Sequence, residues 1–227
     1  AFGSVLSIWH DYRERGIDDP LSAKLPPMEK LREAAAHTDI DKVVIDEAAS
    51  TVYLADPEMR LDVGAVAKGY AVERACRAAE EKGIESLLVS VGGNVRAIGS
   101  MDGRGSPWKV GVQNPGMGEG GPQFLCTVGL RDRSLVTSGS YQRYYTVDGK
   151  TYHHIIDPET LMPAAYYTAV SVLTPDSGAA DALSTALYNM PYEEGLALVE
   201  GMEDTEALWV MPDGSLRESG GFAEAVL

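Results

Sequence analysis

LDVGAVAKGY, residues 61–70, is the stretch from which the rest of this chain is best understood. Its glycine and alanine residues give the backbone almost no side-chain cover, and a helix is expected to begin within it. A bare turn that opens into a helix lets backbone N–H groups approach an anion, and the helix dipole favours negative charge there. Lys68 would add a positive charge for a phosphate, while Asp62 would hold a ribose hydroxyl, a ring N–H or a metal-bound water. Close packing of a helix start through small residues explains the same pattern equally well.

The composition limits what this protein binds. Of its 227 residues, 44% are hydrophobic, and no linker divides the chain, so we expect a single domain over residues 1–227. The formal net charge of −15 argues against binding to nucleic acid or to an anionic membrane through bulk charge. An anionic ligand therefore needs a local basic or metal-bearing site. Cys76 and Cys126 are expected to be buried thiols rather than a disulfide framework or a zinc site.

Hydrophobic periodicity and turn residues predict an α+β fold. Helices are expected at residues 26–35, 67–82, 175–190 and 193–200. Strands are expected at residues 41–46, 51–54, 86–91, 95–98, 108–112, 124–130, 134–138, 144–147, 151–156, 168–173, 206–211 and 216–218. Residues 1–8 are small and apolar, residues 9–13 show no clear period, and neither stretch is assigned an element. Most strands are joined by hairpins, such as the one at Asp148-Gly149, so the sheets should be largely antiparallel with helices packed on them.

Two adjacent histidines carry one possible chemistry. His153 and His154 stand in the expected strand 151–156, so they would point to opposite faces and at most one would face a given site. A histidine near neutrality can take a proton from a hydroxyl nucleophile. A surface hairpin with two exposed imidazoles is the alternative interpretation.

Oxygen-bearing side chains form two further groups. Asp181, Ser184 and Thr185 would share one face of the helix 175–190, since positions i, i+3 and i+4 lie together. One carboxylate with two hydroxyls suits Mg²⁺ that keeps waters and borrows phosphate ligands, although such residues are also common on solvated helix faces. Ser138 and Gly139 lie in a hydroxyl-rich stretch that indicates either a resting place for a phosphate or substrate, or a plain tight turn.

Five motifs in a fixed order are more specific than any one of them. They are DVGAVAKGYAVE (62–73), VSVGGNVRAIG (89–99), SLVTSGSYQRYY (134–145), YHHIIDPET (152–160) and SVLTPDSGAADALSTAL (171–187). Together they resemble the FAD:protein FMN transferases, the ApbE family, from about Trp9 to the C-terminus. The resemblance implies a flavin transferase domain related to the T-fold.

The resemblance also implies a reaction. FMN would pass from FAD to a Thr or Ser hydroxyl of an acceptor flavoprotein subunit, AMP would leave, and Mg²⁺ would be required. FAD is then a substrate, and the partners are FAD and an acceptor of the redox-complex type. Family members act on the extracytoplasmic side of a bacterial membrane and were formerly called lipoproteins. A lipid anchor is accordingly expected in the full-length protein, outside this sequence.

Specific residues match the family's site. Asp62 and Lys68 match its FAD contacts, and Ile156 matches a backbone contact to the flavin nucleotide. His154 matches the histidine suggested to activate the acceptor hydroxyl. The positions that match the metal site are Ala65, through its backbone carbonyl, with Asp181, Ser184 and Thr185.

The chain departs from the family pattern in three places. Gly64-Ala65 stands where Gly-Gly is common, and Thr160-Leu161 where Thr-Gly is common, which removes one residue that readily takes positive φ. An upstream segment that covers the isoalloxazine and adenine is expected to be missing, which would impair FAD binding. Two alternatives stay open: an FAD pyrophosphatase, in which water replaces the acceptor hydroxyl, and a flavin-binding protein without activity.

Overall fold

The computed structural model describes residues 1–117, 120–141 and 143–227, which form two compact units. One unit comprises Ala1–Val63 with Ser140–Ala164, and the other comprises Gly64–Gly139 with Ala165–Leu227. Each is described by itself below. The expectation of a single domain over residues 1–227 stays a prediction.

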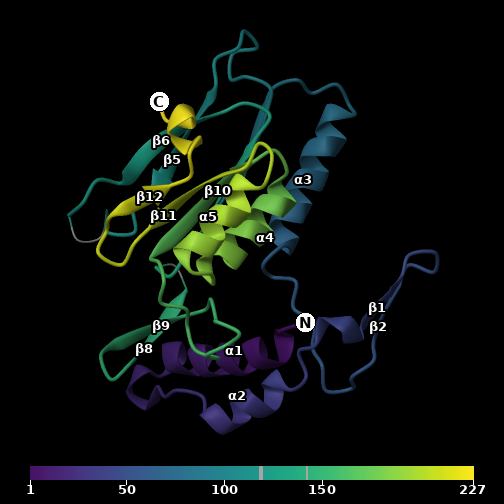
Figure 1. The fold of residues 1–227 in the computed structure, drawn as a ribbon, viewed down its shortest axis with the longest axis vertical. Coiled ribbons are helices and arrows are strands. Elements are labelled where there is room, and N and C mark those ends of the chain that lie inside the picture. The colour runs from purple at the N-terminus through teal and green to yellow at the C-terminus, as the bar shows by residue number, and fades with distance from the viewer. Residues whose placement is uncertain (118–119, 142) are drawn as a thin grey trace. The chain divides into compact units, whose positions relative to one another are not determined.

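The first unit contains two helices and two hairpins. Its elements are α1 (Gly3–Asp18), α2 (Met28–Ala35), β1 (Val43–Asp46), β2 (Thr51–Leu54), β8 (Tyr144–Val147) and β9 (Lys150–His153), with short 3₁₀ turns at Pro20–Ser22 and Ile40–Lys42. Figure 1 shows α1 beside α2, with the hairpin β8–β9 next to α1. The core is an apolar cluster that includes Val5, Trp9, Leu31, Tyr145 and Val147. Within this unit α2 and both hairpins were predicted correctly.

The helix α1 was not predicted. Its first residues lack a side-chain cap, and no acidic residue stands in its first turn. Its buried side, with Val5 and Trp9, is defined by the elements that pack on it rather than by a strong period. Tertiary packing therefore stabilises a helix that local sequence signals do not mark.

The turn after β9 contains a leucine in a backbone conformation that favours glycine. Leu161 takes φ +60°, so the left-handed conformation is kept without glycine. Its N–H donates to the Asp157 carbonyl at 2.8 Å, and its own carbonyl accepts from Trp9 Nε1 at 2.9 Å. The leucine side chain is buried in the core cluster of this unit. Packing and hydrogen bonds thus hold an unfavourable backbone conformation in place.

The second unit is built on a six-stranded sheet with the order β12-β11-β10-β7-β4-β3, in which every pair is antiparallel. Its strands are β3 (Leu87–Val91), β4 (Asn94–Ile98), β7 (Ser134–Gly139), β10 (Ala169–Thr174), β11 (Glu206–Val210) and β12 (Leu216–Glu218). A separate hairpin pairs β5 (Trp108–Gln113) with β6 (Phe124–Leu130). The helices are α3 (Ala67–Glu80), α4 (Ser177–Tyr188) and α5 (Tyr192–Glu200), followed near the end of the chain by a 3₁₀ turn at Phe222–Ala225. The α+β class and the antiparallel sheets are confirmed.

Both faces of this sheet are covered. Every residue of β10 is buried, as expected for a central strand with packing on either side. Leu135 of β7 and Leu173 of β10 pack with Val128 of β6 in one apolar cluster. On the opposite face, α4 lies against β7 and β10, with α3 alongside α4 (Figure 1). This second layer positions the residues of the candidate site.

Three local predictions are corrected. Strand 86–91 was expected to be buried, but β3 is the edge strand of the sheet and Ser90 and Val91 are exposed. A tight turn was one interpretation of the stretch with Ser138 and Gly139, whereas β7 continues to Gly139 because it pairs with β10 along its whole length. The strand expected at 151–156 ends at His153, where pairing with β8 stops.

The two cysteines do not form a disulfide bond with each other. Cys76 is buried and Cys126 is half-buried; both are free, and burial raises the pKa of each thiol. Within the described ranges, no helix combines the length and apolarity that a membrane crossing needs.

Candidate functional site at the start of helix α3

The start of α3 is held against α4 by a backbone-to-carboxylate hydrogen bond. The N–H of Gly69 donates to Asp181 Oδ2 at 2.8 Å, and the Asp181 side chain is almost fully buried. A Cβ added at Gly69 would lie 2.2 Å from the Ser177 carbonyl oxygen and 2.6 Å from Asp181 Cβ. Glycine is therefore required here for the two helices to approach each other. The close-packing interpretation of the small-residue stretch holds at this position.

A buried carboxylate, Glu73, ties the same two helices to the sheet. It accepts hydrogen bonds from Arg77 Nε at 2.9 Å, from Arg96 Nε at 3.2 Å and from the Ser177 N–H at 2.9 Å. Glu73 and Arg96 are 5% and 6% exposed, so this ion pair is shielded from solvent. Glu73 was not singled out from the sequence. Its position four residues after Gly69, on the buried face with Val72 and Cys76, is the signal that would have found it.

Lys68 is anchored by a backbone carbonyl rather than by an acid. Its Nζ donates to the carbonyl of Gly92 at 2.9 Å. Gly92 and Gly93 take φ +50° and +93°, so the turn between β3 and β4 uses a left-handed conformation that glycine adopts readily. No acidic side chain pairs with Lys68 among the described residues. Its charge is thus available to an anionic ligand at the helix start.

Ser138, Ser184 and Thr185 form a chain of hydroxyl groups between β7 and α4. Ser138 Oγ lies 2.8 Å from Ser184 Oγ and 3.2 Å from Thr185 Oγ1. Ser184 Oγ also donates to the Asp181 carbonyl at 3.0 Å, and a hydroxyl has one proton to donate. Ser138 therefore donates to Ser184, and Thr185 donates to Ser138. Ser184 is fully buried, whereas Thr185 is half-buried, so Thr185 is the more accessible end of this series of hydrogen-bonded hydroxyl groups.

Two more candidate site residues, Ala65 and Gly139, belong to the second unit. Ala65 is exposed in the turn that precedes α3, and Gly139 is the last residue of β7. The structure thus places Asp181 of α4 at the start of α3, where Lys68 lies, and joins Ser184 and Thr185 of α4 to Ser138 of β7. The first unit holds Asp62, His154 and Ile156.

His154 is held as a neutral base. Its Nδ1 lies 3.3 Å from the carbonyl oxygen of Arg143, which can only accept a hydrogen bond. The proton is therefore on Nδ1, and Nε2 carries the lone pair. Burial, together with the charges of Arg143 and Arg13, lowers the pKa of His154 to about 4. His154 is consequently uncharged at neutral pH and able to accept a proton.

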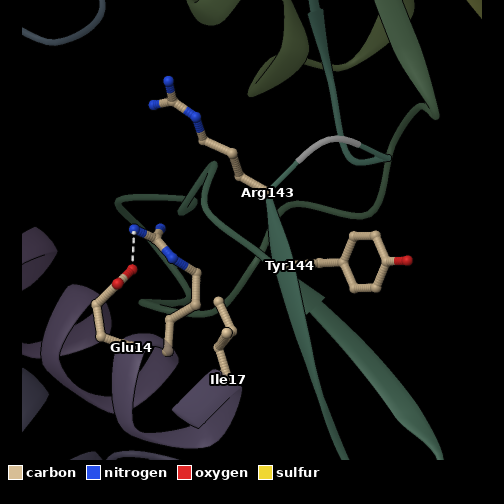
Figure 2. Close-up of a pocket in the computed structure, with 5 residues that line it drawn as sticks. Glu14, Ile17, Arg143 and Tyr144 are labelled. Carbon is tan, nitrogen blue, oxygen red and sulfur yellow. Dashed lines mark hydrogen bonds and ion pairs between the residues drawn. The ribbon is translucent and has the colours of Figure 1, made fainter.

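A shallow pocket lies in the same unit. Its lining residues are Arg13, Glu14, Ile17, Arg143 and Tyr144. Arg13 is paired with Glu14 at 3.3 Å, whereas the side chain of Arg143 is exposed and extends away from Glu14 (Figure 2). The two arginines supply positive charge beside His154 in a chain with a strongly negative total charge.

His153, Ile156 and Asp62 have different surroundings. His153 Nε2 donates to the Ala164 carbonyl at 2.9 Å, and its Nδ1 accepts from the Ile155 N–H at 3.3 Å, so it supports the backbone. Ile156 is buried in the core of the first unit and forms an isolated bridge with Pro163. Asp62 is exposed in a segment without regular structure.

These features describe an α+β protein in which Lys68 and the Asp181 carboxylate lie at the start of α3. Hydrogen-bonded hydroxyl groups connect β7 with α4. A family model described as the ApbE family matches residues 1–209. The FAD:protein FMN transferase of Treponema pallidum (strain Nichols) is 35% identical over 239 residues, covering 100% of this chain and 64% of its own. The chain belongs to the ApbE family.

Solved structures agree with this assignment. The ApbE protein of Thermotoga maritima MSB8 has a TM-score of 0.84 at 31% identity, covering 98% of this chain and 70% of its own. The flavin transferase ApbE of Vibrio cholerae has a TM-score of 0.78 at 28% identity, covering 99% and 69%. The chain spans 64% and 56% of the lengths of the first two curated relatives, from Treponema pallidum and Klebsiella pneumoniae.

Proposed function

We propose that this chain is the catalytic part of a flavin transferase, which moves FMN from FAD to a Thr or Ser hydroxyl of an acceptor protein and releases AMP. The name FAD:protein FMN transferase, carried by relatives in several bacteria, supports this assignment. The observation that carries the proposal is the start of α3, where Lys68 has no acidic partner among the described residues and Asp181 is buried against the helix.

Each candidate residue has its own role in the proposed reaction. Lys68 neutralises charge on the pyrophosphate of FAD, and the neighbouring helix start favours the same anion. The hydroxyl oxygen of the acceptor attacks the phosphorus of the FMN half, and the bond from this phosphorus to the oxygen of AMP breaks. His154 Nε2 takes the hydroxyl proton, because it carries a lone pair at neutral pH. Asp62, Ile156, Ser138 and Gly139 are assigned to binding of the flavin nucleotide.

The donor set fits Mg²⁺. The Asp181 carboxylate, the Thr185 hydroxyl and the Ala65 carbonyl are all oxygen ligands, which hard cations prefer. Within the described ranges, no group of three His, Cys, Asp or Glu side chains is arranged to hold a metal, so a zinc-type site is not favoured. Ser184 is assigned to the same site, where its buried hydroxyl accepts from Ser138, which in turn accepts from Thr185. Mg²⁺ bound there would neutralise pyrophosphate oxygens.

An acceptor assay tests the proposal. Full-length protein is incubated with FAD, Mg²⁺ and a protein that carries a Thr or Ser target, and flavin fluorescence is followed on the acceptor in a denaturing gel. Asp181→Ala should abolish labelling, because it removes the carboxylate of the cation site. Glu194→Ala, which removes an exposed acid from α5, should leave labelling unchanged.

The other outcomes discriminate between functions. Release of AMP without labelled acceptor would favour an FAD pyrophosphatase, and binding of FAD without either product would favour a flavin-binding protein. Labelling by Asp181→Ala at the wild-type rate would place the cation site elsewhere. We further propose that the full-length protein acts on the extracytoplasmic side of a bacterial membrane through a lipid anchor, which cell fractionation would test.

A further inference from the structure

Asn94 is a buried amide without a visible partner. It is the first residue of β4, directly after Gly92 and Gly93, and its side chain is 0% exposed. Neither Oδ1 nor Nδ2 forms a hydrogen bond with any described residue. Leaving one buried polar group unpaired costs about 1–3 kcal/mol, so few remain unpaired in folded proteins. An amide with both ends unpaired therefore calls for a specific reason.

The location of Asn94 supplies that reason. A Cβ built on Gly69 would lie 2.9 Å from Asn94 Nδ2 and 2.6 Å from Asp181 Cβ, so both side chains approach the same side of Gly69. The N–H of this glycine occupies Asp181 Oδ2. Asn94 is thus a neighbour of the carboxylate that we assign to the cation.

Its backbone also holds the amide in place. Asn94 pairs with Val91 of β3 on one side and with Val136 of β7 on the other. On the adjoining turn, the Gly92 carbonyl accepts from Lys68 Nζ. The amide therefore belongs to a strand that is paired on both sides and directly follows the turn to which Lys68 is hydrogen-bonded.

We propose that Asn94 is a positioning residue for Asp181, and that Asn94 Nδ2 donates to this carboxylate when Mg²⁺ is bound. This inference rests on the cation site of the proposed function. If a bound cation turned the carboxylate away from the Gly69 N–H, Asn94 Nδ2 would be a side-chain donor close to it. Hydrogen bonds to ligating carboxylates fix their orientation, and losing one typically weakens metal affinity by about 10–100-fold.

The test uses Asn94→Leu, which keeps a similar volume and removes both polar ends. In metal-free protein this change should raise Tm, because an unpaired buried amide is replaced by an apolar group. The same variant should bind Mg²⁺ about 10–100-fold more weakly, as measured by calorimetry and by the Mg²⁺-dependent rise in Tm. A purely structural asparagine, or one paired with a buried water, would leave Mg²⁺ affinity unchanged in this variant, and that result would overturn the inference.

Three further proteins complete the experiment. Ser177→Ala is the matched control, because the Ser177 hydroxyl is also buried without a partner in the described ranges, and its loss should not change Mg²⁺ affinity. Asn94→Ala gives the same readout if the leucine variant fails to fold. Asp181→Asn separates this inference from the proposed function. If wild type binds Mg²⁺ no better than Asp181→Asn, the cation site itself is wrong and the inference is overturned with it. If Asp181→Asn loses binding while Asn94→Leu keeps it, Asn94 alone is excluded.

Discussion

The start of α3 and the segment that carries His154 hold their functional groups in opposite ways. At α3, regular elements approach through Gly69 and place Lys68 and Asp181 by helix and sheet geometry. His154 lies beyond the end of β9, where the backbone carbonyl of Arg143 orients its ring. Regular elements place side chains by position in the sequence, whereas irregular segments place them by contacts that form only on folding.

The largest expected effect concerns the irregular segment. His154→Ala should reduce acceptor flavinylation by about 10²–10⁴-fold while FAD still binds, because a positioned base contributes that much. Labelled acceptor per unit time, with FAD affinity measured separately, checks this. Equal rates for wild type and variant would assign the base to another residue.

Two further measurements sharpen the role of His154. The folded-state pKa of about 4 lies below the ordinary value of 6.5, so the neutral base is present at neutral pH. Flavinylation should therefore stay constant down to about pH 5 and fall as the pH drops through about 4. The stability that this neutral ring contributes is complete above pH 6.5 and is lost as the pH falls toward 4, a loss that His154→Ala should not show.

The structure changes the effect that we expect from His153→Ala. From strand alternation its loss should be nearly silent, but His153 has hydrogen bonds to two backbone groups. We expect the variant to be less stable and still active as a folded protein. Loss of chemistry in a fully folded His153→Ala would reverse the assignment of the two histidines.

A smaller effect is expected when the positive charge of Lys68 at the start of α3 is removed. Lys68→Ala should weaken FAD binding by about 1.5–3 kcal/mol, the usual contribution of a hydrogen bond to a charged group. Riboflavin, which lacks the pyrophosphate, should bind both proteins alike in a fluorescence titration. Lys82→Ala, just beyond the other end of α3, is the matched control for the loss of charge. Equal losses for FAD and riboflavin would mean that Lys68 supports the fold.

Gly69→Ala tests the regular region by overpacking. The added Cβ would overlap the Ser177 carbonyl, so α3 and α4 must separate, at a cost of about 1–3 kcal/mol of unfolding free energy. Gly195→Ala in α5 is the control, since its nearest contact is a flexible leucine methyl group at 3.2 Å and alanine favours helix. Denaturant unfolding that shows both variants equally stable would contradict close packing at Gly69.

Leu161→Gly should have a partly cancelled effect on stability, because two energetic terms oppose each other. Glycine relieves the positive φ, worth about 1–2 kcal/mol, but removes a buried leucine side chain, which costs about 2–5 kcal/mol on truncation to alanine. The net loss should be about 0–4 kcal/mol in a denaturant melt. A more stable variant would show that backbone strain dominates this turn.

The sequence alone determined the class of fold, and its motifs nominated the site residues through their resemblance to the family. Periodicity marked α3, α4 and α5, and hairpin turns marked the antiparallel strands, because these signals are local. Local signals did not reveal α1, the exposed edge position of β3, or the end of β9 before His154, since each depends on which elements lie beside it.

Only the tertiary structure decided how the site residues are held. Spacing placed Asp181 and Thr185 on one helix, but the hydrogen bond from Gly69 and the hydroxyl chain through Ser138 join distant segments. The same holds for the unpaired amide of Asn94 and for the tautomer of His154, whose proton position follows from a carbonyl eleven residues earlier. Burial and hydrogen-bond partners are properties of the folded chain, because they depend on residues that sequence distance does not bring together.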